Sequence, residues 1–162
     1  IIRIPFKIAS APIRVKEQKT EATIENLNLL LAEDNELNAE IAETLLSDEG
    51  AKITVVKNGL QAVKAFQENP CNYFDAILMD IMMPVMDGLA ATEAIRAAAR
   101  EDAKTIPIIA MTANAFQEDQ EQCYKAGMNA HLAKPLNMEK VIRTIYEQCR
   151  YKLSGRQQNK KT

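Results

Sequence analysis

The chain has 162 residues, 47% of them hydrophobic, and a formal net charge of −2 at neutral pH. This composition allows one domain with a well-filled core and gives no overall attraction to nucleic acid or to a membrane surface. Cys71, Cys123 and Cys149 form no CxxC pair, which predicts reduced thiols without a disulfide in the cytoplasm, and no apolar run reaches the roughly 20 residues of a membrane-spanning helix.

Residues 1–26 show no sustained helical or strand period after the apolar run IIRIPFKIA. We interpret them as the end of an upstream strand followed by a linker. The chain begins with Ile1, which predicts that it is a piece of a longer protein.

From Leu27 onward, short apolar runs alternate with segments of helical period. In the first helical segment, Leu37, Ile41 and Leu45 recur at helical spacing, with Ala42 and Leu46 beside them. Helices are expected to start near residues 37, 59, 89, 115 and 137. The apolar runs predict five strands, at 27–32, 53–56, 76–79, 106–111 and 130–133. The alternation predicts an α/β fold with a doubly wound parallel sheet of five strands and five helices.

Polar residues follow four of the predicted strands. Glu33 and Asp34 follow the first strand, Asp80 the third, Thr112 the fourth, and Lys134-Pro135 the fifth. Ligands of parallel α/β sheets gather outside the carboxyl ends of the strands, so we expect these side chains to share one site.

Three carboxylates at one sheet edge repel one another unless a cation, either a metal ion or a lysine, lies between them. No cluster of His or Cys accompanies them, so the oxygen ligands favour Mg²⁺, with Mn²⁺ as the alternative, over zinc. A metal, a carboxylate nucleophile, a hydroxyl and an ammonium meet the needs of phosphoryl transfer.

The runs LLLAEDNELNAEIAETLL, DAILMDIMMPVMDG, IIAMTANAF and AGMNAHLAKPL resemble the response-regulator receiver family, particularly the receivers of hybrid histidine kinases. The resemblance covers about Leu27 to Arg150 and implies a flavodoxin-like strand order of 2-1-3-4-5. It implies that Asp80 accepts a phosphoryl group and that Thr112 and Lys134 contact the phosphoryl oxygens. It also implies a cis peptide bond before Pro135.

The same resemblance implies a metal-binding set and a switch. Asp34 and Asp80 would bind the metal directly, Glu33 through water, and Met82 through its backbone carbonyl. Thr112 and His131 would form the switch, although the family more often has Tyr or Phe where this chain has His131. The alternative for His131 is a partly exposed strand residue without a switch role.

The implied function is a phosphorelay receiver. It takes the group from the catalytic and dimerisation domains of a histidine kinase and passes it to a histidine phosphotransfer protein or to water. The alternative is a regulatory docking module without phosphorelay turnover. A haloacid-dehalogenase phosphatase is disfavoured because it requires a second acid where this chain has Met82. We expect no nucleic-acid partner and no direct membrane contact, and the resemblance leaves open a membrane anchor elsewhere in the parent kinase.

The resemblance also suggests domain boundaries. The run IIRIPFKIA resembles the last strand of a histidine kinase ATP-binding domain. We therefore expect residues 1–26 to hold the end of that domain and a linker, residues 27–151 to form the receiver, and residues 152–162 to be a disordered tail.

Overall fold

The computed structural model describes the backbone of residues 22–114 and 116–159, and the side chains of this part as far as residue 150. The upstream strand expected within IIRIPFKIA lies outside the described residues. Every helix in the described part is too short or too polar to cross a lipid bilayer.

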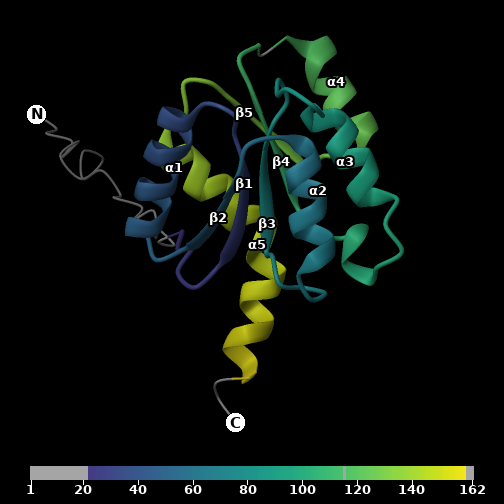
Figure 1. Cartoon of the computed structure of the whole chain (residues 1–162). Coiled ribbons are helices and arrows are strands. Elements are labelled where there is room, and N and C mark those ends of the chain that lie inside the picture. The colour runs from purple at the N-terminus through teal and green to yellow at the C-terminus, as the bar shows by residue number, and fades with distance from the viewer. Residues whose placement is uncertain (1–21, 115, 160–162) are drawn as a thin grey trace, which may run out of the picture.

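A five-stranded parallel sheet forms the centre of the domain (Figure 1). Its strands lie in the order β2-β1-β3-β4-β5, and every neighbouring pair is parallel. This order is the flavodoxin-like arrangement that the resemblance implied. The strands are β1 (Asn28–Ala32), β2 (Lys52–Val56), β3 (Ala76–Asp80), β4 (Ile108–Thr112) and β5 (Ala130–Ala133).

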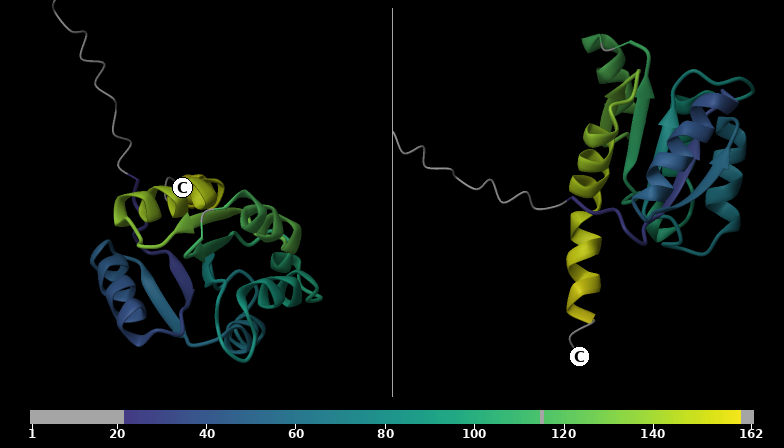
Figure 2. Two further views of the ribbon diagram at one scale, coloured as in Figure 1. Left: turned by 90° about the horizontal axis from the view of Figure 1, so that it is seen from above. Right: turned by 90° about the vertical axis from the view of Figure 1, so that its left-hand side faces the viewer.

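Helices cover both faces of the sheet, as Figure 2 shows from above. The helices α1 (Glu36–Asp48) and α5 (Met138–Asn159) pack on one face. The other face is covered by α2 (Gly59–Glu68), α3 (Gly88–Arg96) and α4 (Gln117–Ala126), with a short 3₁₀ helix at Glu101–Ala103. Because alternate strand residues point to opposite faces, each strand contributes to both cores.

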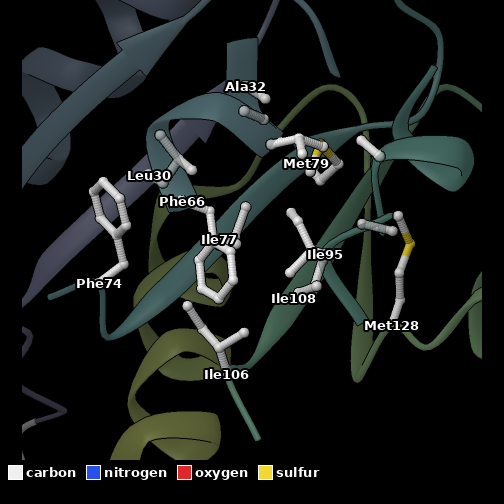
Figure 3. Close-up of a cluster of buried hydrophobic side chains, with 14 of the residues drawn as sticks. Leu30, Ala32, Phe66, Phe74, Ile77, Met79, Ile95, Ile106, Ile108 and Met128 are labelled. Carbon is white, nitrogen blue, oxygen red and sulfur yellow. The ribbon is translucent and has the colours of Figure 1, made fainter. Parts of the chain in front are cut away.

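The core under α2, α3 and α4 is built from aliphatic and aromatic side chains (Figure 3). Leu30, Ile77 and Ile108 come from three neighbouring strands, and Phe66 and Ile95 come from the covering helices. All five are at most 1% exposed, and burying each side chain contributes roughly 1.5–3 kcal/mol. This core fixes how far the strand ends lie from one another.

Local signals in the sequence set the helix ends. The side-chain oxygens of Asn58 and Asp87 accept the N–H groups of Gln61 and Ala90, at 2.8 Å each. They satisfy donors that the first turn of a helix leaves free. Gly127 ends α4 in the left-handed region, with φ of +108°.

Helix α1 forms as predicted, but its most apolar stripe does not enter the core. Ala42 and Leu46 are buried, whereas Leu37, Ile41 and Leu45 are 65%, 50% and 39% exposed. The pattern identifies an apolar stripe, but the neighbouring face, with Ala39, Ala42 and Leu46, is the one that packs against the sheet.

Both ends of the domain differ from the prediction. Ile24, assigned to the linker, is fully buried in the core with α1 and α5. The tail predicted to be disordered from residue 152 is helical as far as Asn159, and α5 extends beyond the base of the sheet (Figures 1 and 2). A helix nucleated by packed turns adds further residues at little cost, so polar residues can continue it.

Candidate functional site

The residues predicted to share a site do come to one edge of the sheet. Glu33 follows β1, Asp80 and Thr112 are the last residues of β3 and β4, and Lys134 follows β5. Because these strands are adjacent and parallel, their carboxyl ends meet there.

Lys134 is at the centre of this edge. Its Nζ donates hydrogen bonds of 2.8 Å to Oδ2 of Asp80 and to Oε2 of Glu33. The side chains of Asp80 and Glu33 are only 6% and 4% exposed, and that of Lys134 is 23% exposed. Burial lowers the pKa of Lys134, but the two carboxylates outweigh this effect, so that its pKa is raised above the usual value. Lys134 is therefore charged at neutral pH.

The acids form a compact oxygen cluster. One carboxylate oxygen from each of Glu33, Asp34 and Asp80 lies within 4.8 Å of the others, with Asp34 exposed and the other two buried. Hard divalent cations such as Mg²⁺ prefer oxygen donors of this kind. The donor set therefore fits the predicted metal.

Met82 follows Asp80 on the β3–α3 loop. Its backbone N–H donates to Oδ1 of Asp80 at 3.2 Å, which fixes the orientation of the carboxylate. The metal-binding role of its carbonyl stays a prediction. The loop also depends on Gly88, because a Cβ there would lie 2.2 Å from the carbonyl oxygen of Asp80. Only glycine allows this close approach of two backbone segments.

The two residues predicted to form the switch make local contacts. The Thr112 hydroxyl donates to the carbonyl of Asn114 at 2.9 Å and accepts the Asn114 N–H at 3.1 Å. His131 is half-buried on β5. Its Nδ1 lies 3.4 Å from the hydroxyl of Tyr124, and the two rings meet edge to face at 6.2 Å. The peptide bond between Lys134 and Pro135 is cis, the form that the resemblance implied.

Sequence reasoning missed a groove beside this edge. The groove has a volume of about 490 Å³ and lies between α1 and the β5–α5 segment. Lys134 and Glu33 line one part of it, and the remainder is mostly apolar. The apolar lining includes Ile41, Leu45, Met111, Pro135, Leu136 and Met138. The apolar stripe of α1 was the sequence signal for this groove. Whether the sheet covers that stripe could not be judged without the fold.

Comparisons with known proteins agree with this geometry. The family model "Response regulator receiver domain" matches residues 29–146. Probable histidine kinase 1 of Oryza sativa subsp. indica is 35% identical over 168 residues, which cover 86% of this chain and 17% of that protein. Hybrid signal transduction histidine kinase I of Dictyostelium discoideum is 40% identical over 126 residues, which cover 76% of this chain and 7% of that protein. The chain therefore spans less than a fifth of the length of these curated relatives.

Two solved structures extend the comparison. The receiver domain of sensor histidine kinase PA1611 from Pseudomonas aeruginosa is 42% identical, with a TM-score of 0.69 over 76% of this chain and 98% of that one. That structure holds a magnesium ion in its active-site cleft. The receiver domain of Ssk1 from Saccharomyces cerevisiae, crystallised with the histidine phosphotransfer protein Ypd1, is 28% identical. Its TM-score is 0.68, over 77% of this chain and 90% of that one.

The family match runs from β1 into α5, the strand order is that of the matched structures, and the acids and lysine lie at the carboxyl edge of the sheet. On these grounds the chain belongs to the response-regulator receiver family.

Proposed function

We propose that Asp80 of this receiver accepts a phosphoryl group from a kinase phosphohistidine and passes it to a phosphotransfer protein or to water. The observation that carries the proposal is the 2.8 Å contact of Lys134 with Asp80 inside the carboxylate cluster. A fixed cation beside a buried carboxylate orients that carboxylate as a nucleophile. The same cation can neutralise the negative charge on the oxygens of the phosphoryl group once it is bound.

In the proposed reaction, an oxygen of the Asp80 carboxylate attacks phosphorus and the phosphorus–nitrogen bond of the phosphohistidine breaks. The imidazole nitrogen leaves with the bonding electrons, and an acyl phosphate remains on Asp80. The hydrogen bonds from Met82 and Lys134 to the two oxygens of Asp80 orient its carboxylate. Lys134 then pairs with a phosphoryl oxygen, and the Thr112 hydroxyl turns from Asn114 toward the phosphoryl group.

A metal ion held by Asp34, Asp80 and the Met82 carbonyl, with Glu33 acting through water, would supply further charge neutralisation. We propose Mg²⁺ as this ion, with Mn²⁺ as a substitute of similar ligand preference. The oxygen cluster of Glu33, Asp34 and Asp80 supports this assignment.

We propose that Thr112 and His131 form the switch. The movement of Thr112 toward the phosphoryl group leaves space beside β5, into which His131 turns. This movement breaks the 3.4 Å contact with Tyr124 and alters the α4–β5 face. The position of Tyr124 on α4, half exposed, supports a change that a partner can detect.

For the partner, we propose a histidine phosphotransfer protein that docks on the groove and on the exposed stripe of α1. An apolar helix face from such a protein would cover Leu37, Ile41 and Leu45, whose exposure of at least 39% is high for large aliphatic side chains. The groove includes Lys134, so a protein seated there lies beside the phosphoryl site. The complex of Ssk1 with Ypd1 supports this class of partner.

We also propose the parent context. Residues 1–26 would hold the end of the ATP-binding domain of a hybrid histidine kinase and a linker to the receiver. The catalytic and dimerisation domains of that kinase would donate the phosphoryl group. The curated relatives are much longer kinases, which supports this context. Thiol cysteines of this kind, Cys71, Cys123 and Cys149, fit the reducing cytoplasm.

The proposal is tested with small phosphodonors. Wild type, Asp80→Asn and the control Asp48→Asn, an exposed acid outside the cluster, are incubated with acetyl phosphate and Mg²⁺. We expect the mass of one phosphoryl group to be added to wild type and to the control, but not to Asp80→Asn, and chelation of the metal to abolish the gain.

A folded wild type that binds Mg²⁺ but reacts with neither acetyl phosphate nor beryllofluoride would contradict the proposal. The chain would then be better explained as a regulatory docking module of the kinase.

A further inference from the structure

The β3–α3 loop contains an unusual backbone conformation at Val85. Its φ is +69°, and the N–H of Met86 donates to the carbonyl of Pro84 at 2.8 Å. The three residues therefore form a γ-turn of the rare positive-φ form. A β-branched residue adopts this region only at a cost, whereas glycine or asparagine does so readily.

Packing inside the domain offsets little of this cost. The Val85 side chain is 79% exposed, so it buries little apolar surface against the described residues. The loop is held at both ends by backbone hydrogen bonds of 2.9 Å, from Gly88 to Ile81 and from Gly59 to Met86. Main-chain contacts therefore maintain the turn, and they do not require a valine.

The loop separates its apolar side chains into two sets. Met83 and Met86 are half-buried and pack against the core under α2 and α3. Met82 and Val85 are 77% and 79% exposed. Backbone strain that packing does not offset is characteristic of functional positions. Here the strained turn leaves the apolar side chain of Val85 exposed on the loop that follows Asp80.

We propose that Val85, together with Met82, is an apolar contact for the histidine phosphotransfer protein that docks over Asp80 to receive its phosphoryl group, an inference that rests on the function proposed above. Asp80 is 4% exposed, so an incoming histidine reaches it only when its carrier covers the surrounding loops. Met82 donates its N–H to Asp80, so this loop is in direct contact with the reacting carboxylate. The occupant is a histidine phosphotransfer protein, whose apolar surface around the histidine buries the two side chains.

The test compares Val85→Gly with Asn72→Gly. Asn72 also has positive φ, +63°, but it precedes β3 and so lies at the opposite end of the sheet from Asp80. The probe is yeast Ypd1, and the receiver is first phosphorylated with acetyl phosphate. The readouts are the thermal unfolding midpoint of each receiver and the rate of phosphoryl transfer to Ypd1.

We expect Val85→Gly to raise the unfolding midpoint, because glycine removes the strain, and to slow transfer to Ypd1 about tenfold, as for loss of an interface anchor. Val85→Leu, which keeps an apolar side chain, should restore most of the transfer rate. Asn72→Gly should leave the rate unchanged. A gain in stability combined with a loss of transfer is not the signature of a merely structural residue.

The inference is overturned if Val85→Gly transfers as fast as wild type, or if its midpoint falls. It is also overturned if phosphorylated wild type transfers nothing to Ypd1. A wild type that acetyl phosphate cannot phosphorylate is a different result, because the proposed function itself then fails.

Discussion

The ammonium of Lys134 lies 2.8 Å from Oδ2 of Asp80. The same nitrogen lies 2.8 Å from Oε2 of Glu33, so one cation serves two buried carboxylates. The lysine therefore stabilises the acids of the folded domain as well as taking part in the proposed chemistry.

Replacing Lys134 with alanine should leave two buried carboxylates without their cation. We expect the free energy of unfolding without metal to fall by about 3 kcal/mol, the cost of removing one partner of a buried ion pair. Saturating Mg²⁺ should raise the unfolding midpoint more in Lys134→Ala than in wild type, because the ion binds a more negative site. Thermal unfolding with and without Mg²⁺ measures both effects.

The control is Lys57→Ala, which removes an exposed pair with Glu36 whose side chains are 63% and 81% exposed. Such pairs contribute little, so its stability and its response to Mg²⁺ should match those of wild type. An equal Mg²⁺ response in Lys134→Ala and wild type would contradict the assigned role of the lysine.

Truncating a buried and an exposed apolar residue of α1 should cost very different amounts of stability. Leu46→Ala should cost about 2–5 kcal/mol, because the residue is fully buried and a cavity remains. Ile41→Ala, at a position that is 50% exposed, should change stability by less than about 1 kcal/mol. Urea unfolding of both variants measures the difference, and similar losses would mean that α1 presents a different face to the sheet.

The Arg100–Asp102 pair predicts a dependence of stability on acid pH. Burial raises the pKa of Asp102, but hydrogen bonds from Arg100 and from the Asn72 N–H outweigh this, so the pKa in the folded domain is below its ordinary value of 3.8. The contribution of this lowered pKa to the free energy of unfolding is fully present above pH 3.8, the ordinary pKa of the carboxyl. It is lost as the pH falls through the lower pKa that Asp102 has in the folded domain.

Asp102→Asn should remove this part of the pH dependence and cost about 1–3 kcal/mol at neutral pH, as for a lost charged hydrogen bond. Urea unfolding between neutral and acid pH tests this expectation. Parallel pH profiles for wild type and Asp102→Asn would show that the carboxyl keeps its ordinary pKa when folded.

Gly88→Ala should perturb the acceptor through the backbone. The added Cβ would lie 2.2 Å from the Asp80 carbonyl oxygen and 2.9 Å from Cα of Ile81. Neither atom belongs to a flexible side chain, so we expect a loss of at least about 1–3 kcal/mol and slower phosphorylation by acetyl phosphate. Ser47→Ala, an exposed substitution in α1, serves as the control for stability. A Gly88→Ala variant as stable as wild type would contradict this close approach.

The three cysteines should differ in reactivity toward a thiol reagent. Cys71 is exposed, whereas Cys123 and Cys149 are buried. Burial and the nearby Asp119 raise the pKa of Cys123, which keeps its thiol protonated. Mass spectrometry after brief labelling should find one modification at Cys71 in the native chain and three after unfolding.

Strand ends were the most predictable part of the site. Glu33, Asp80, Thr112 and Lys134 could be placed at one edge from the sequence, because the β–α alternation defines a parallel sheet and thereby the direction of every strand. Their distances could not be predicted, since these depend on side-chain packing between residues distant in sequence.

Surface exposure was the least predictable part. The spacing of Leu37, Ile41 and Leu45 identified a helix but not which of its faces the sheet covers. In the same way, nothing local in the sequence indicates that Val85 adopts positive φ, because the turn is maintained by backbone contacts of Gly59 and Gly88 with the loop. The buried Ile24 was missed because it precedes the first strand and fills a gap that only the folded domain creates.

The contact between Lys134 and Glu33 joins residues that are 101 positions apart in the chain. Closing so long a loop is entropically costly, and contacts of this kind form after local structure during folding. A nascent chain that has not yet added β5 has the acids but not their cation. By this reasoning the acceptor site is completed only when the last strand joins the sheet, and reaction with a phosphodonor would report that synthesis and folding of the domain are finished.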